Sequence, residues 1–152
     1  MPIIWGNIED KDLNFPKESF DYILLGDVIE HLVNPEETLR YLQQFLKRDG
    51  YIIASIPNIL HYSAFIPLPF GEFNYSEAGI LDRTHLRFFT WRSICNMFER
   101  LQCEIVEVRQ NEMDSFMEPW IEGIISKLCD ISTEIDRQGF YTWQYCMKVR
   151  KR

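Results

Sequence analysis

The sequence predicts an α/β fold: a mostly parallel sheet with helices on both faces and an antiparallel last strand. Two near-continuous apolar runs, at 20–25 and 51–56, are typical of parallel strands covered on both faces. A helical pattern separates these runs, as in a right-handed strand–helix–strand crossover unit. The length of 152 residues suits one domain, or part of one.

The first half of the chain contains signals for a further strand and for the helix of the crossover. The apolar run 2–6, closed by Gly6-Asn7, predicts a short first strand that ends in a turn. Asn34 can cap a helix, Pro35 suits its first position, and two acidic residues follow in the first turn. We expect this helix to end at 47–50, before the strand 51–56.

The second half predicts a second crossover unit and a final strand. Residues 58–90 have no regular period, and so long a connection is typical of a functional lid. Thr90 can cap a helix that precedes an alternating strand at 103–109. An apolar helix at 117–129 and a strand at 140–149 complete the chain. We therefore expect a single domain over 1–152 with two insertions, at 58–90 and 111–138.

Charge and cysteine content exclude several classes of protein. The chain carries 23 acidic and 16 basic residues, a net charge of −7 and a pI near 5.0, which argues against a nucleic-acid partner. The four cysteines lack the close spacing of a zinc site or the density of a secreted scaffold, so we expect reduced thiols and a cytoplasmic location. No apolar run approaches the roughly 18 residues of a membrane span.

The ends of the predicted strands are the places to look for a ligand site, because ligands of such sheets bind beyond the carboxyl ends of the strands. These ends are Asn7-Ile8, Gly26-Asp27-Val28 and Pro57-Asn58. An Asn or Asp there can accept a hydrogen bond from an exocyclic amine, and a glycine lets a ligand approach the backbone. Ordinary turns explain the same residues equally well.

A series of motifs resembles the second half of the S-adenosylmethionine-dependent methyltransferase fold. The resemblance is to the small-molecule branch that includes the ubiquinone-biosynthesis O-methyltransferases, and it covers about residues 2 to 109. The motifs are Gly6-Asn7-Ile8-Glu9-Asp10, the segment 26–32 (Gly-Asp-Val-Ile-Glu-His-Leu), Asn34-Pro35, the segment 46–50 and the segment 81–90 (Leu-Asp-Arg-Thr-His-Leu-Arg-Phe-Phe-Thr). The resemblance implies a Rossmann-like sheet and S-adenosyl-L-methionine as the cofactor.

The resemblance also implies positions for cofactor contacts. Asn7 matches the position that accepts a hydrogen bond from the adenine amine, and Ile8 matches the residue that packs on the adenine ring. Gly26 and Asp27 match the strand end that faces the methionine part of the cofactor, and Val28 matches a residue that lines the cleft.

Three residues are candidates for proton transfer from the acceptor. Glu30 and His31 match the Glu-His pair of the ubiquinone-type enzymes, where the segment beginning at Asp27 helps to hold a divalent metal. A hard cation needs more oxygen ligands than Asp27 and Glu30 offer, so we predict no metal. We instead assign His31, beside Glu30, as the base for the acceptor hydroxyl. His85 is the other candidate base. Equally, it can have a purely structural role and hold the long connection 58–90 in place.

Aromatic residues in the two insertions indicate the nature of the acceptor. They supply more aromatic surface than a solvated loop should expose, so we predict an acceptor-side lid and an aromatic or lipid-like small-molecule acceptor. The residues are Phe65, Phe70, Phe73, Tyr75 and Trp120.

The sequence departs from the family in its N-terminal part. It contains no G-x-G-x-x-G turn, and only one residue precedes the run 2–6, so the first two strands of the family's sheet are lacking. We expect a methyltransferase whose N-terminal half is missing from this chain. The alternatives are a non-catalytic, methyltransferase-derived interaction domain and an unrelated α/β binding module. Unpaired sheet edges further predict a homodimer that exchanges N-terminal strands.

Overall fold

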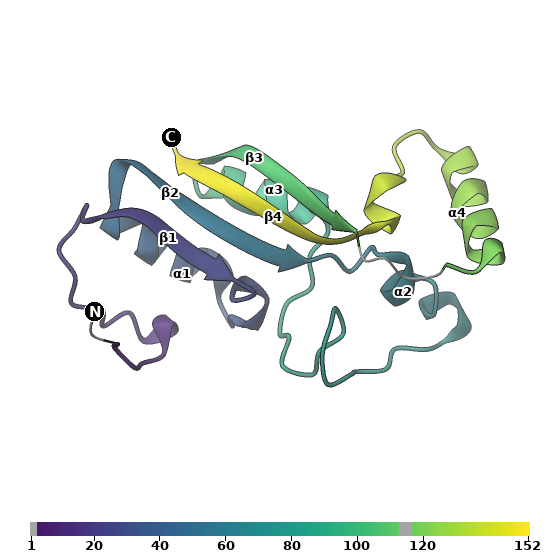
Figure 1. The fold of residues 1–152 in the computed structure, drawn as a ribbon, viewed down its shortest axis with the longest axis horizontal. Helices are drawn as coiled ribbons and strands as arrows, with labels where there is room; N and C mark the ends of the chain where they lie inside the picture. The colour runs from purple at the N-terminus through teal and green to yellow at the C-terminus, as the bar shows by residue number, and fades with distance from the viewer. Residues whose placement is uncertain (1–2, 113–116) are drawn as a thin grey trace.

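A four-stranded sheet forms the centre of the molecule in the part of the chain that the computed structural model describes, residues 3–112 and 117–152. Its strands are β1 (Phe20–Gly26), β2 (Leu46–Pro57), β3 (Cys103–Glu112) and β4 (Thr142–Lys151), in the order β1-β2-β4-β3 (Figure 1). β1 pairs with β2 in parallel, and β4 pairs antiparallel with both β2 and β3. The prediction of a mostly parallel sheet with an antiparallel last strand is confirmed.

The helical elements connect and flank these strands. The α-helices are α1 (Pro35–Leu42), α2 (Tyr62–Phe65), α3 (Trp91–Arg100) and α4 (Pro119–Ile131). The short 3-10 turns are η1 (Ile8–Asp10), η2 (Ile29–His31), η3 (Gln43–Phe45), η4 (Leu68–Phe70) and η5 (Gln138–Phe140). Pro2 of the expected first strand and residues 113–116 of the second insertion lie outside the described residues.

The main core lies on one face of the sheet. Ile52, Ala54 and Ile56 alternate along β2 and pack with apolar residues of both α1 and α3. The expectation of helices on both faces was therefore wrong for the described residues, because both crossover helices cover the same face (Figure 1). On the opposite face, Tyr22 and Leu24 of β1 are 55% and 73% exposed.

β1 is an edge strand rather than a fully covered one. Its pairing partner among the described residues is β2, and of its seven residues only Leu25 is buried. The continuous apolar run correctly predicted a parallel strand, but the burial of both its faces was a wrong inference. Beyond Asp21, its segment 22–25 carries no charge or proline, and an apolar edge of this kind favours strand addition.

One boundary and one cap differ from those expected in the first crossover. The helix α1 ends at Leu42 instead of at 47–50, because Leu46 already pairs with Phe20 as the start of β2. Asn34 does precede α1, but its side chain makes no capping bond. Its backbone carbonyl instead accepts a hydrogen bond from the N–H of Thr38.

The start of the chain does not form the strand expected at 2–6. Residues 3–5 have no regular secondary structure and no strand pairing, and Trp5 is 92% exposed. A strand needs a neighbour to satisfy its backbone groups, and no described strand lies beside this segment. By contrast, α3 begins as expected at Thr90, whose hydroxyl accepts from the N–H of Ser93 in a capping box.

A second, smaller core joins the two insertions. Tyr62 and Ile66 from the first insertion pack with Ile125 of α4 and with Phe140. Trp120 at the start of α4 remains half exposed. Among the described residues, no helix is both long and apolar enough to cross a membrane.

Candidate active site

The carboxyl end of β1 is tied to the ends of two neighbouring strands through Asp27. The Asp27 N–H donates to the hydroxyl of Ser55 on β2 at 2.9 Å, and that hydroxyl donates to the Asp27 carboxylate at 3.0 Å. The side-chain amide of Gln144 on β4 donates to the same carboxylate. Asp27 itself has a left-handed backbone, with φ of 51°. Sequence reasoning missed Ser55 and Gln144, although a serine near the end of an apolar strand is a usable signal.

Gly26 leaves the backbone at this strand end open. A Cβ built on Gly26 would meet only the Ser55 Oγ, at 3.9 Å, and the φ of Gly26 is not positive. Val28, two residues later, is half-buried and packs against the main core. The strand end therefore offers backbone groups and free space to a ligand, as the match to the methionine side of a cofactor site requires.

The turn expected on the adenine side lies against the segment that follows η2. Asn7 caps η1, because its side-chain oxygen accepts from the Glu9 N–H at 3.1 Å. The Glu9 carboxylate accepts from the N–H groups of Val33 and Asn34, which holds its pKa below the usual value. Ile8 is half-buried against the main core, so Asn7-Ile8 is a helix cap rather than a strand end.

Glu30, His31 and His85 form a compact cluster just beyond the carboxyl end of β1. One potential ligand atom from each residue lies within 4.8 Å of the other two. The carbonyl of Glu30 accepts from the N–H groups of Leu86 and Arg87, at 2.9 and 3.0 Å, which brings the segment of His85 to η2. The rings of the two histidines lie 4.8 Å apart, edge to face. The sequence singled out all three residues, and the structure brings them together.

The Glu30 carboxyl group is buried without a hydrogen-bonding partner. Glu30 is 1% exposed, and neither carboxylate oxygen has a partner among the described residues. Burial is the main cause that raises the pKa of Glu30 to about 7, and the negative charge of Asp27 acts in the same direction. Buried carboxylates without a partner are costly and gather at functional sites.

Both histidines of the cluster are held by backbone carbonyls. The His31 Nδ1 lies 3.1 Å from the Thr84 carbonyl oxygen, and the His85 Nδ1 lies 2.9 Å from that of Ile80. A carbonyl oxygen only accepts, so each Nδ1 carries a proton, and the neutral form of each ring keeps its lone pair at Nε2. The two rings can thus take a proton or bind a cation at Nε2.

The third histidine, His61, lies elsewhere and is structural. Its Nδ1 accepts from the N–H of Ser63 and caps α2, and burial lowers the pKa of His61 to about 4. Three residues earlier in the chain, the fully buried Asn58 donates to the carbonyls of Gly139 and Thr142, both at 2.8 Å. Asn58 therefore joins the end of β2 to the start of β4. The sequence marked it only as a strand-end residue.

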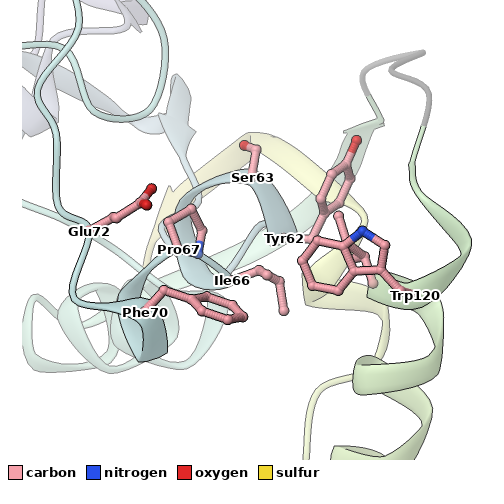
Figure 2. A pocket seen from close by; sticks show the side chains of 8 residues that line it. Tyr62, Ser63, Ile66, Pro67, Phe70, Glu72 and Trp120 are labelled. Atoms are coloured by element: carbon pink, nitrogen blue, oxygen red, sulfur yellow. The ribbon is translucent and has the colours of Figure 1, made fainter.

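An apolar cavity of about 420 Å³ lies between the two insertions. Figure 2 shows Ile66 and Phe70 on one side of it and Trp120 of α4 on the other. The rings of Phe70 and Trp120 are 6.3 Å apart. Among the other aromatic residues predicted for a lid, Phe65 packs on Phe140 in the second core instead.

Comparison with known proteins decides the family. The model of the methyltransferase domain family matches residues 6–108, which is more than half of the chain. This chain belongs to the methyltransferase domain family. The fold, a four-stranded sheet with an antiparallel last strand, is the Rossmann-like sheet that the resemblance implied. No curated protein matches the chain.

Solved structures of S-adenosylmethionine-dependent methyltransferases share the fold of this methyltransferase domain. An enzyme of Archaeoglobus fulgidus has 17% identity and a TM-score of 0.60, with 97% of this chain and 66% of that chain covered. A possible histamine N-methyltransferase of Thermotoga maritima has 18% identity and a TM-score of 0.63, with 97% and 62% covered. The Burkholderia thailandensis 1,6-didemethyltoxoflavin-N1-methyltransferase, solved with its substrate and S-adenosylhomocysteine, has 14% identity and a TM-score of 0.50, with 93% and 47% covered. The chain thus spans less than two thirds of the length of each of these three structures.

Proposed function

We propose that this domain takes part in S-adenosylmethionine-dependent methyl transfer to a small aromatic or lipid-like acceptor, in the cytoplasm. The observation that carries the proposal is the position of the Glu30, His31 and His85 cluster directly after the open strand end at Gly26 and Asp27. A cofactor at the strand end and an acceptor at the cluster would be neighbours.

The residues present can contact the adenine and the methionine part of the cofactor, but the glycine-rich turn that would hold the part between them is not in the sequence. Asn7 and Ile8 are proposed to contact the adenine, and Gly26, Asp27 and Val28 the methionine part. The space around Gly26 supports this assignment, since a ligand can approach its backbone closely. The sequence has no glycine-rich turn to hold the cofactor's ribose and carboxylate side, so we propose weak binding by this chain alone.

The cluster supplies the acid–base chemistry of the proposed reaction. When bound, S-adenosylmethionine supplies an electrophilic methyl group on a sulfonium sulfur and leaves as S-adenosylhomocysteine. In the metal-free chain, His31 takes the acceptor's hydroxyl proton at Nε2 as the acceptor oxygen bonds to the methyl carbon. Glu30 stands beside this base, and His85 is the second residue able to take the proton.

The two insertions, 58–90 and 111–138, are proposed to form the acceptor side. The cavity between Ile66, Phe70 and Trp120 is apolar, and its volume of about 420 Å³ lies within the range of small-molecule sites. The volume suits a small molecule, and the apolar lining favours an aromatic or lipid-like acceptor over a polar one.

Equilibrium dialysis with radiolabelled S-adenosylmethionine tests the proposal. We expect retention above that of ATP, with a dissociation constant weaker than roughly 10 μM, or about 7 kcal/mol of binding free energy. Gly26→Val should reduce binding at least about tenfold, because the new side chain fits the fold yet fills the space a ligand needs.

Gly123→Val is the matched control, since a Cβ at Gly123 in α4 also meets nothing within 4 Å. It should leave binding unchanged. Equal binding by both variants, or no retention above ATP at millimolar cofactor, would contradict the proposed site. A dissociation constant tighter than 10 μM would contradict the weak anchoring.

We further propose that the chain forms a homodimer, a property that a non-catalytic interaction domain would share. The outer edge of β1 has no partner among the described residues, and the apolar side chains of Ile3, Ile4 and Trp5 are exposed. If residues 3–5 of a neighbouring chain paired with β1, they would satisfy its open edge and cover their own exposed side chains. In a two-fold dimer each chain makes this contact once with the other.

Sedimentation velocity at micromolar concentration checks the dimer. We expect a dimer for the unaltered chain and a monomer for Ile4→Pro, because proline removes a backbone donor from the added strand. Ile131→Asp, which also alters an exposed apolar residue, should remain dimeric. A monomeric unaltered chain would refute the dimer without affecting the proposed methyl transfer.

A further inference from the structure

We propose that the cavity between the two insertions binds an acceptor that carries an alkylated ammonium group at one end. The inference names the substrate class of the acceptor side, and it rests on the proposed methyl transfer. Such an acceptor is aromatic or aliphatic along its body and positively charged at one end. The observation that carries the inference is the juxtaposition of exposed aromatic rings with the Glu72 carboxylate on the wall of the cavity.

The aromatic walls of the cavity come from both insertions. Phe70 ends the turn η4, and Trp120 lies on the opposite side in the first turn of α4 (Figure 2). Their rings are 6.3 Å apart, edge to face, and the two residues are 65% and 52% exposed. The face of a tryptophan ring attracts organic cations more strongly than that of any other aromatic side chain, and quaternary ammonium groups are typical ligands of aromatic sites. Ring surface is therefore open to a cation in this cavity.

The turn that follows η4 places Glu72 on the same wall. Gly71 has a left-handed backbone, with φ of 79°, and its N–H donates to the Leu68 carbonyl at 2.9 Å. The N–H of Glu72 donates to the Pro67 carbonyl at 3.2 Å. These bonds fold the chain back on itself, so that Phe70 and Glu72 both line the cavity.

The Glu72 carboxylate gives the cavity a negative charge that no other group neutralises within the described part of the chain. Among the described residues that line the cavity, Glu72 is the only charged one, and its carboxylate has no hydrogen bond or ion pair with any of them. Elsewhere, the carboxylates of Glu36, Glu77 and Glu122 each pair with an arginine.

A free negative charge beside an aromatic wall favours a cation over a neutral molecule or an anion. The net charge of −7 on the whole chain acts in the same direction. An alkylated ammonium group presents carbon–hydrogen groups to its surroundings, so it can contact the apolar lining and the carboxylate together. The apolar body of the acceptor then fills the rest of the cavity, whose volume is about 420 Å³.

Titration of the ¹⁵N-labelled full chain with benzyltrimethylammonium tests the inference, with benzyl alcohol as the neutral probe. The readout is the indole N–H signal of Trp120, which Trp120→Leu identifies among the four tryptophans. We expect benzyltrimethylammonium to bind at least about fivefold more tightly than benzyl alcohol. Sodium chloride at about 1 M should reduce this difference, because salt screens the exposed carboxylate.

Glu72→Gln separates the charge of the carboxylate from the shape of the side chain. It should weaken benzyltrimethylammonium binding at least about threefold and leave benzyl alcohol binding unchanged. Glu77→Gln is the matched control, since it removes the same charge from the same insertion. Glu77 is exposed, pairs with Arg83 and is not one of the residues that line the cavity, so its replacement should change neither affinity.

The outcomes distinguish the ammonium class from the proposed function. Equal benzyltrimethylammonium binding by a folded Glu72→Gln and the unaltered chain, or an equal loss in Glu77→Gln, would overturn the inference. A Trp120 signal that moves with benzyl alcohol but not with benzyltrimethylammonium would overturn the ammonium class and leave methyl transfer to a neutral acceptor standing. A signal that moves with neither probe would overturn both the inference and the proposed role of this cavity as the acceptor side.

Discussion

Replacing Glu30 with methionine is expected to stabilise the metal-free chain by about 2 kcal/mol at pH 8. The change removes two buried carboxylate oxygens that have no partner among the described residues and puts an apolar side chain of similar size in their place. The backbone bonds from Leu86 and Arg87 to the Glu30 carbonyl are kept. Urea unfolding in the presence of a chelator measures the free energy of unfolding.

Glu30→Gln is the matched control for this prediction. Glutamine removes the charge but keeps buried polar atoms, so it should stabilise the chain less than methionine does. A methionine variant less stable than the unaltered chain in chelator would show that the carboxylate has a stabilising partner.

Replacing Asn58 with aspartate is expected to destabilise the chain by about 4 kcal/mol. The Asn58 amide donates to two carbonyls, those of Gly139 and Thr142, and its oxygen accepts from the Leu60 N–H at 3.1 Å. Aspartate cannot donate, so two carbonyls lose their donor and a buried negative charge faces them. Urea unfolding again gives the change in free energy.

Asn58→Ala provides the comparison that identifies the cause. Alanine also removes the donor, but it brings no charge and should cost roughly 2–3 kcal/mol. If aspartate costs no more than alanine, the buried charge adds nothing to the loss, and if alanine costs nothing, the two donated hydrogen bonds are not what joins β2 to β4.

The sequence predicted the regular elements well where local signals and tertiary packing agree. Strands β2, β3 and β4 follow apolar or alternating runs, and α3 follows a capping threonine at Thr90. The errors lie where long-range pairing overrides local pattern. Leu46 continues a helical stripe yet joins β2, because Phe20 of β1 is there to pair with it. Residues 3–5 look like a strand, yet no described strand pairs with them.

The candidate site was predictable as a set of residues but not as an arrangement. Glu30, His31 and His85 were recognised from two separate motifs, the segments 26–32 and 81–90, and His31 and His85 are 54 residues apart in the chain. Their contact depends on the bonds from Leu86 and Arg87 to the Glu30 carbonyl, which no sequence pattern encodes.

The central claim is that the strand end at Gly26–Val28 and the turn at Asn7-Ile8 form the cofactor-facing side of this methyltransferase domain. Titration of the ¹⁵N-labelled chain with S-adenosylhomocysteine to millimolar concentration tests it most directly, because amide shifts locate weak binding. We expect shifts at Asn7, Ile8, Gly26, Asp27 and Val28, and adenosine alone should move only the first two. Shifts confined to the cavity around Phe70 and Trp120, or no shifts at all, would contradict the claim.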